Sequence, residues 1–233
     1  MASGTLFIVA TPIGNLQDIT FRAVEVLTAA DAIFCEDTRV TAKLLAHLKI
    51  QKPLFAYHQH SDEKVIGQVA ATLREGMRVV LVSDAGTPGI NDPGGMLIAR
   101  LLAVEPTLTI VPIPGPNAAI TALSASGFPA GRFQYWGFIP HKKGRQTLFR
   151  ELAACEDTVV FYESKHRIGK TLEQVREAFA AAETPERPLV IGRELTKQFE
   201  TFYRGTVEQV LRALQEDETL GEFVVVVGPR GWH

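Results

Sequence analysis

The sequence predicts an α/β protein of two domains, and three observations lead to this prediction. Short apolar runs alternate with amphipathic helical patterns, which is typical of a mostly parallel sheet covered by helices on both faces. Pro112, Pro114 and Pro116 fall within five residues and interrupt any regular element, so we expect a domain boundary there. The length of 233 residues, 46% of them hydrophobic, is sufficient for one large or two small domains.

The first part of the chain, residues 1–113, is expected to form a domain around a mainly parallel sheet. Short apolar runs predict strands at residues 6–10, 32–35, 53–57, 78–82 and 108–111. Apolar residues at helical spacing predict helices at 21–30, 41–48, 62–75 and 95–104, the first of them capped by Thr20. Because a helix between two strands usually joins parallel neighbours, we expect these strands to run in one direction.

The second part, residues 114–233, has a different rhythm and is expected to be an α/β domain with a mixed sheet. Helices are predicted at 118–126, 145–154, 169–182 and 207–214, and strands at 133–138, 158–162, 189–193 and 222–227. Residues 199–203 follow closely enough to be a hairpin partner of the strand at 189–193. Small ligands often lie between domains, so we expect a binding cleft between the two parts.

Composition and charge exclude several classes of protein. The formal net charge of −2 excludes a polycation that binds nucleic acid through bulk charge. The only cysteines, Cys35 and Cys155, lie in apolar segments and form neither a disulfide framework nor a zinc-ligand set, which favours a reducing cytoplasm. The N-terminus has no basic region, and no apolar run has the length of a membrane span, so we expect neither export nor membrane insertion.

Three loops rich in glycine and proline follow predicted strands, at residues 10–20, 83–95 and 112–119. In α/β sheets, ligands bind at the carboxyl ends of strands, where glycine lets the backbone approach closely. The loop at residues 83–95 matches neither the Walker A pattern nor the dinucleotide fingerprint, so phosphate cradling is not supported. Each loop alone is equally a turn, and Asp92 can cap a helix that starts near Pro93. Together they predict a pocket lined by backbone amides and carbonyls.

Two further segments combine acids and cations at the end of a predicted strand. Residues 36–39 are Glu-Asp-Thr-Arg, and residues 161–167 are Phe-Tyr-Glu-Ser-Lys-His-Arg. A carboxylate at such a place can accept a proton, and a guanidinium can orient an anion. For the first segment the alternative is a helix N-cap formed by Asp37 or Thr38. For the second it is a solvated charged face that includes Lys165 and Arg167.

Basic residues are concentrated between residues 141 and 170, where seven Lys or Arg face four Asp or Glu. Aromatic residues at 133–138 precede this stretch, and basic groups combined with aromatic ones suit contact with RNA. The alternative is that the aromatic strand belongs to a core. His58 and His60 have no third ligand nearby in sequence, so we expect no metal requirement.

Several motifs together are similar to those of a known family. They are Ala-Thr-Pro-Ile-Gly-Asn-Leu at 10–16, Glu-Asp-Thr-Arg at 36–39, Ser-Asp-Ala-Gly-Thr-Pro at 83–88 with Asn-Asp-Pro-Gly at 91–94, Pro-Gly-Pro at 114–116, Phe-Tyr-Glu-Ser at 161–164 and Arg-Glu-Leu-Thr-Lys at 193–197. The chain resembles the rRNA branch of the tetrapyrrole methylase superfamily from residue 5 to about residue 228. The resemblance implies a class III methyltransferase fold of two α/β domains, with S-adenosylmethionine in the cleft between them. It also implies a homodimer that methylates the ribose 2′-OH of a cytidine in the 16S rRNA of the small ribosomal subunit.

The resemblance also implies which residues form the site. Those expected to contact S-adenosylmethionine are Pro12, Ser83, Asp84, Ala85, Gly86, Thr87, Pro88, Pro114, Gly115, Ala118, Ala119, Tyr162, Glu194, Leu195 and Pro229. Those expected to position RNA phosphates are Arg39, Lys142, Arg145, Lys165, Arg167 and Arg193. Glu36, Asp37 and Glu163 are candidates for the base that removes the 2′ proton, and the sequence does not choose among them.

Two departures from the family pattern bear on the substrate. The usual glycine-rich first loop appears here as Thr-Pro-Ile-Gly-Asn-Leu, which counts against a porphyrin substrate. Related sequences commonly continue past the last strand with a further helical segment, whereas this one stops at residue 233, and we expect reduced RNA affinity if that segment grips the ribosome. Two alternatives stay open: a methyltransferase acting on a small tetrapyrrole, and an RNA-binding ribosome assembly factor without turnover.

Overall fold

The computed structural model describes residues 4–58, 63–216 and 221–232. The chain divides into two compact units, residues 1–117 and residues 118–233, and each is considered by itself. The division lies four residues after the boundary expected from the prolines, because Pro114–Asn117 stay with the first unit. No helix within the described ranges has the length and apolar character needed to cross a membrane.

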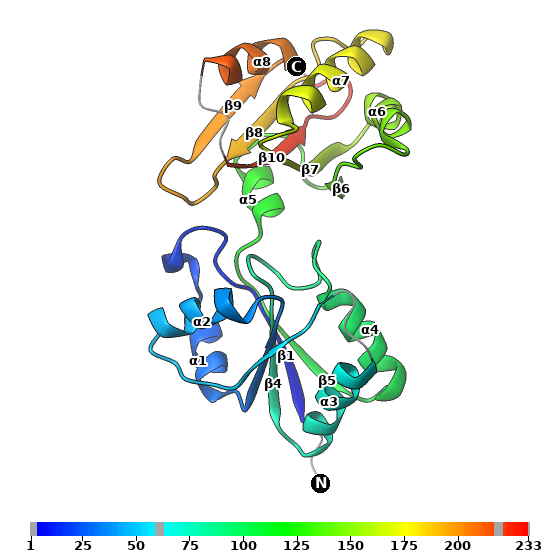
Figure 1. The fold of residues 1–233 in the computed structure, drawn as a ribbon. Helices are drawn as coiled ribbons and strands as arrows, with labels where there is room; N and C mark the ends of the chain where they lie inside the picture. Colours follow the sequence, from blue (N-terminus) through cyan, green and yellow to red (C-terminus); the bar gives the residue numbers. More distant parts are fainter. Residues whose placement is uncertain (1–3, 59–62, 217–220, 233) are drawn as a thin grey trace. The chain divides into compact units, whose positions relative to one another are not determined.

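The first unit is built around a five-stranded sheet of order β3-β2-β4-β1-β5, in which all neighbours are parallel (Figure 1). Its elements are β1 (Thr5–Val9), the short 3-10 helix η1 (Leu16–Asp18), α1 (Phe21–Ala29), β2 (Ala32–Cys35), α2 (Thr38–His47), β3 (Leu54–Ala56), α3 (Glu63–Arg74), β4 (Arg78–Val82), α4 (Gly94–Val104) and β5 (Thr109–Ile113). The predicted parallel sheet is therefore confirmed.

Helices cover both faces of this sheet, as the alternation of strands and helices predicted. One face packs against α3 and α4 through a buried cluster that includes Leu81, Val69 and Leu97. The other packs against α1 and α2 through a second cluster that includes Val80 and Leu27. Because alternate strand residues point to opposite faces, a strand such as β4 is apolar at nearly every position.

The second unit has a mixed sheet of order β6-β7-β10-β8-β9. Only β6 and β7 are parallel; β10 runs antiparallel to β7 and β8, and β9 is the hairpin partner of β8. The elements are α5 (Ala118–Ser124), β6 (Phe133–Phe138), α6 (Arg145–Ala154), β7 (Thr158–Ser164), α7 (Ile168–Ala181), β8 (Leu189–Arg193), β9 (Thr201–Gly205), α8 (Val207–Gln215) and β10 (Glu222–Val227). The predicted mixed sheet and hairpin are confirmed.

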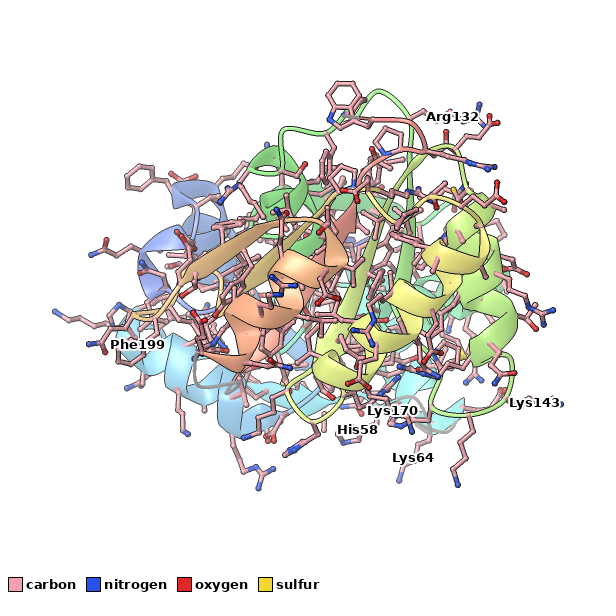
Figure 2. The ribbon with its side chains drawn as sticks, turned by 90° about the horizontal axis from the view of Figure 1, so that it is seen from above. His58, Lys64, Arg132, Lys143, Lys170 and Phe199 are labelled. Atoms are coloured by element: carbon pink, nitrogen blue, oxygen red, sulfur yellow. The ribbon has the colours of Figure 1, made fainter. Side chains whose placement is uncertain are left out.

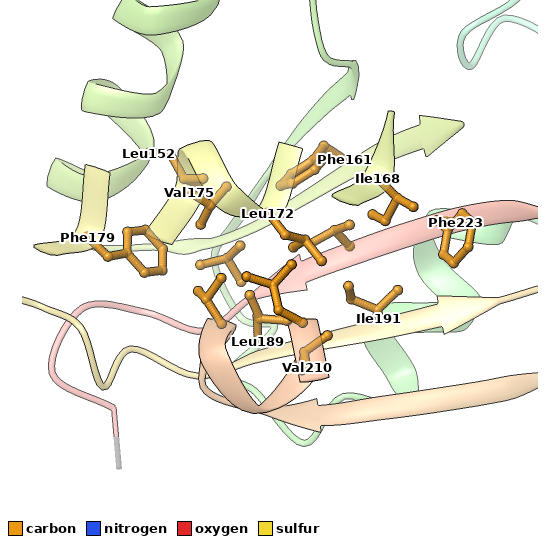
Figure 3. Close-up of a cluster of buried hydrophobic side chains, with 14 of the residues drawn as sticks. Leu152, Phe161, Ile168, Leu172, Val175, Phe179, Leu189, Ile191, Val210 and Phe223 are labelled. Atoms are coloured by element: carbon orange, nitrogen blue, oxygen red, sulfur yellow. The ribbon is translucent and has the colours of Figure 1, made fainter. Parts of the chain in front are cut away.

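The core of the second unit lies between this sheet and helices α6, α7 and α8. Figure 3 shows Leu172 and Val175 of α7 meeting Phe161 of β7, Ile191 of β8 and Val210 of α8. These five side chains are at most 1% exposed. The opposite face of the sheet is contacted by α5, which packs against β10, β7 and β8.

Helix starts differ from prediction where a polar cap extends a helix. Thr20 caps α1 as predicted, its side chain accepting a hydrogen bond from the N–H of Ala23. Helix α2 starts at Thr38, three residues before the expected start, because the Asp37 side chain accepts from the N–H of Arg39 and caps it. The N-cap interpretation of residues 36–39 is thus confirmed for Asp37.

Candidate functional site

Strand order brings the predicted binding loops together at one edge of the first sheet. After β1 the chain passes over β4 to reach β2, and after β4 it passes over β1 to reach β5, so the two connections leave in opposite directions. Such a reversal between neighbouring parallel strands is where α/β sheets bind ligands. The loops after β1 and β4 begin at this point, and the loop after β5 begins one strand away.

The loops after β1 and β4 are joined through their main chains. Thr11 and Gly86 exchange two backbone hydrogen bonds of 2.9 and 3.0 Å, which form an isolated bridge outside the sheet. The buried Thr11 hydroxyl also donates to the carbonyl of Ser83 at 3.1 Å. Gly86 has a φ of +81°, a conformation that glycine adopts without steric cost. The two loops therefore form one braced structure.

The loop after β5 is attached to the other two. The Thr87 hydroxyl donates to the carbonyl of Pro116 at 3.0 Å. A Cβ atom placed on Gly115 would lie 2.9 Å from the Cβ of Ala10, so only glycine lets these two loops approach so closely. Six of the expected donor-binding positions, Ser83 to Pro88, lie in the loop after β4 at this edge.

The end of β2 joins the same edge, because the N–H of Asp37 donates to Oδ1 of Asp84 at 2.9 Å. Next to it, the pKa of Glu36 is raised, first by burial and then by the charges of Asp84 and Asp92. The pKa of Asp37 is strongly lowered by its hydrogen bonds with the Arg39 side chain and N–H. Glu36 therefore binds a proton more tightly than an ordinary carboxylate, and the neighbouring Asp37 binds one less tightly.

Asp92 organises the rest of the loop after β4. Its Oδ1 accepts hydrogen bonds from the N–H groups of Gly89 and Gly94, at 2.7 and 2.6 Å. The expected capping role is therefore performed at Gly94, the first residue of α4, although Pro93 occupies the N-cap position. Oδ2 of Asp92 is buried and has no hydrogen-bond partner in the part of the chain that the structure describes. This loop keeps an acceptor available.

In the second unit, Glu163 is enclosed. The residue is 1% exposed, and its Oε2 accepts from the Thr171 hydroxyl at 2.6 Å and lies 3.3 Å from Arg167 and 3.7 Å from Arg145. Its Oε1 accepts from the N–H of Ser164 at 2.8 Å. A buried carboxylate with these partners serves the structure of the unit, and nothing in it resembles the partly open Glu36.

Arg145 is also enclosed, at 6% exposure. Its guanidinium donates to Oε1 of Gln174 at 2.7 Å, to the carbonyl of Pro140 at 3.0 Å and to the Thr171 hydroxyl at 2.5 Å. Burial, followed by the charge of Arg167, lowers its pKa. Arg167 donates to the same Pro140 carbonyl. Most donors of these two expected phosphate ligands are thus engaged within the unit.

Tyr162, an expected donor contact, lies on the sheet face that carries α5. Its hydroxyl accepts from the N–H of Ala119 at 3.1 Å, and burial raises its pKa. The rings of Tyr135 and Phe138 both pack edge-on against it. They share this face because β6 is irregular between them, where Gly137 has a φ of +62°. Tyr135 and Phe138 of the aromatic strand thus form a cluster with Tyr162, and this cluster is partly open to solvent because Phe138 is 53% exposed.

The remaining expected residues are spread over the two units. Glu194 has a φ of +50° and binds the ammonium of Lys197, Leu195 is buried, and Arg193 is buried and donates to the Tyr203 hydroxyl. Arg39, Lys142 and Lys165 are exposed, and Pro12 and Pro229 are half-buried.

His60 lies outside the described residues, and the described ones contain no group of three His, Cys, Asp or Glu able to hold a metal ion.

Arg150 and Lys170 belong to the basic stretch at residues 141–170 but were not among the residues expected to position phosphates. With Lys142, Arg145 and Arg167 they line one hollow between α6, α7 and the loop before α6. A signal was present, because Arg167, Lys170 and Gln174 follow one another at spacings of three and four residues, which places them on one face of α7.

Known proteins resemble this chain over nearly its whole length. The family model for Tetrapyrrole (Corrin/Porphyrin) Methylases matches residues 5–211. A protein of Escherichia coli O157:H7 named Ribosomal RNA small subunit methyltransferase I is 47% identical over 97% of this chain and 78% of its own length. A Halalkalibacterium halodurans protein of the same name is 44% identical over 98% of this chain and 77% of its own. The crystal structure of the methyltransferase CobJ matches with a TM-score of 0.68 and 22% identity, covering 97% of this chain and 95% of that one, which shows a shared fold.

Proposed function

The chain belongs to the tetrapyrrole methylase family, and on that premise we propose that it methylates the RNA of the small ribosomal subunit. The proposed reaction transfers a methyl group from S-adenosylmethionine to the 2′-hydroxyl of a cytidine ribose in 16S rRNA. The observation that carries the proposal is the identity of 44% and 47% with two proteins named Ribosomal RNA small subunit methyltransferase I, over 97% or more of this chain.

The braced loops of the first unit have the features that a methyl donor with amino and hydroxyl groups needs. The close approach at Gly115 holds the loops after β1 and β5 together, and the buried Oδ2 of Asp92 is an acceptor without a partner among the described residues. In our proposal Pro12, residues 83–88, Pro114 and Gly115 hold the donor from this unit. Ala118, Ala119, Tyr162, Glu194, Leu195 and Pro229 are proposed as its contacts from the second unit. When bound, S-adenosylmethionine supplies an electrophilic methyl group on a sulfonium.

Of the three candidate bases, Glu36 has the properties the reaction requires. The base must accept a proton from the ribose hydroxyl, and a carboxylate accepts one more readily when its pKa is raised. The pKa of Glu36 is raised, that of Asp37 is lowered by Arg39, and Glu163 is enclosed by two guanidinium groups. We therefore assign to Glu36 the role of the base that accepts the proton of the ribose 2′-hydroxyl. Asp37 caps α2 and orients Asp84, and Glu163 maintains the second unit.

Contact with RNA is assigned to the exposed cations, of which Arg39, Lys142 and Lys165 are the expected ones. Lysine and arginine bind phosphates with little dependence on base sequence, so these residues would position the RNA and leave the choice of nucleotide to other contacts. The family resemblance further supports a homodimer that acts in the cytoplasm.

The test is tritium transfer from labelled S-adenosylmethionine to small ribosomal subunits that lack the modification. Alkaline hydrolysis follows, because a 2′-O-methylated nucleotide leaves a cleavage-resistant dinucleotide. Label in that dinucleotide would support donor, substrate and ribose chemistry together. Donor binding with label transferred only to a small tetrapyrrole would overturn the RNA substrate, and RNA binding without donor binding would favour an assembly factor.

A further inference from the structure

A basic hollow opens on the second unit, formed by the loop before α6, by α6 and by α7. Its volume is about 460 Å³. Five Lys or Arg residues line it and no Asp or Glu does. The remaining lining groups are polar or glycine, with no apolar side chain among them. A site of this size suits a small charged group with part of its carrier, and the lining favours an anion.

The floor of the hollow is rigid. Arg145 and Arg167 reach it, and both are fixed from below by Glu163, which is itself hydrogen-bonded to Thr171. One carboxylate balances only one of the two guanidinium groups, so the floor keeps a positive charge. Because these side chains are held by several hydrogen bonds each, binding an anion above them requires little reordering.

The rim has three cations with few or no side-chain partners among the described residues. Lys142 and Lys170 are exposed, and neither side chain has an ion pair or hydrogen bond to any residue that the structure describes. Arg150 makes a single long hydrogen bond, 3.4 Å, to the Thr147 hydroxyl. The N-terminus of the ten-residue helix α6 also faces the hollow, through Gly144, Gln146 and Thr147, and no side chain caps it. The positive end of a helix dipole adds to the attraction for an anion.

We propose that this hollow binds a backbone phosphate of the substrate RNA, held by Lys142, Arg150 and Lys170 above the fixed Arg145 and Arg167. The proposal rests on the proposed function, since it takes the RNA to be the substrate. A phosphodiester fits better than a protein carboxylate, because a protein segment would also bring apolar side chains and the hollow has no apolar wall. The site then positions the RNA and takes no part in the reaction itself.

The experiment compares Lys142→Gln and Lys170→Gln with Lys143→Gln in the whole chain. Lys143 carries the same charge and precedes α6 in the same loop, yet it does not line the hollow, and Figure 2 shows its side chain extending away from that loop. The probe is the small ribosomal subunit lacking the modification, used both for direct binding without the donor and for methyl transfer.

We expect Lys142→Gln and Lys170→Gln each to raise Kd and KM for the subunit about five- to tenfold and to leave kcat and donor affinity unchanged. Each should also make the dependence of log Kd on log salt shallower by about one. Lys143→Gln should change Kd less than about twofold, since an exposed charge outside the hollow contributes only to the general field.

Equal losses in Lys142→Gln and Lys143→Gln would overturn the hollow as a site and leave bulk charge as the explanation. Competition by poly-glutamate as effective as that by RNA of equal charge would overturn the phosphate preference. The two proposals fail differently. If the wild-type chain transfers no methyl group to the subunit but binds it in a Lys142-dependent manner, the proposed reaction is wrong and the phosphate site stands.

Discussion

The ends of β2 and β7 carry similar sets of acidic and basic residues, but the acids are partly exposed at the end of β2 and the acid is buried at the end of β7. At the end of β2, Glu36 and Asp37 are partly exposed, and Asp37 pairs with an Arg39 whose side chain is 86% exposed. At the end of β7, Glu163 is buried between Arg145 and Arg167. Burying a carboxylate is expensive unless it is paired, so the second arrangement commits its acid to the structure. The first leaves an acid free to exchange a proton.

The supporting contacts differ in the same sense. At the edge that β2 joins, the Thr11–Gly86 bridge braces the loops after β1 and β4 through backbone groups. Asp37 and Asp84 add a helix cap and a hydrogen bond, so the acids supply only part of the support. Around β7, side chains themselves form the connections between the strand, α6 and α7. Glu36 therefore lies where the main chain supplies much of the rigidity, whereas Glu163 is itself part of the connections.

The largest expected effect is on the stability of the second unit. Glu163→Gln leaves the buried Arg145 and the half-buried Arg167 without their carboxylate, so we expect the free energy of unfolding to fall by about 3 kcal/mol. Both tryptophans, Trp136 and Trp232, belong to this unit, so tryptophan fluorescence in urea reports its unfolding. The control is Glu208→Gln, which removes two exposed ion pairs, with Arg176 and Arg212, and should cost less than about 1 kcal/mol. Full stability with a hundredfold loss of kcat would instead make Glu163 the base.

Glu36→Gln should act on the reaction and leave the fold intact. Removing a general base is expected to lower kcat about a hundredfold, measured in single-turnover methyl transfer. The base works in its deprotonated form. Because the pKa of Glu36 is raised, the wild-type rate should decrease as the pH is lowered, and this decrease should begin at a pH above the usual carboxyl range. The raised pKa means that the native state binds this proton more tightly than the unfolded chain, so stability falls as the pH rises above that range. Glu36→Gln should therefore be slightly more stable at neutral pH.

The matched control for that variant is Glu25→Gln, on the exposed side of α1. Its kcat should equal that of the wild-type chain. An unimpaired Glu36→Gln variant would show that Glu36 is not the base, and the two strand ends would then not differ in function.

Gly115→Ala tests the braced loops. The added Cβ would lie 2.9 Å from the Cβ of Ala10, so the loops after β1 and β5 must separate. We expect the Kd for S-adenosylmethionine, measured by calorimetry, to rise about tenfold, which corresponds to about 1.4 kcal/mol. Gly67→Ala in α3 is the control, because a Cβ there meets nothing within 4 Å. Unchanged donor affinity in Gly115→Ala would place the donor away from these loops.

The smallest expected effect concerns the cap of α2. Asp37→Ala removes the side chain that accepts from the N–H of Arg39, and losing such a cap costs about 1 kcal/mol. Faster hydrogen exchange in the first turns of α2 would show it. Asp37→Asn keeps a capping oxygen and should exchange nearly as slowly as the wild-type chain, whereas equal acceleration in both variants would assign the effect to charge.

Sequence periodicity predicted the elements well because it reports which side of each element is buried. The strands β2, β4, β6, β8 and β10 begin and end where expected, since apolar runs between polar or glycine-rich stretches leave little freedom. Periodicity does not report caps, so α2 was placed three residues late. Nor does it report bulges, so the face shared by Tyr135 and Phe138 was not foreseen.

The sequence predicted which segments form the site, but it did not predict how these segments are arranged in space. The loops were identified by their glycines and by their position after strands, but their contact depends on the order β3-β2-β4-β1-β5, which the local pattern does not contain. Arg145 illustrates the same limit. At a helix start in a basic stretch it reads as a surface cation, and only the packing of α6 on α7 encloses it.

The bridge between Thr11 and Gly86 is made of backbone N–H and C=O groups, which every amino acid except proline possesses. Substitutions elsewhere in the two loops change what projects from them without loosening the bridge itself. An engineer who wished to redirect this scaffold would vary the exposed loop positions freely and leave the bridge untouched.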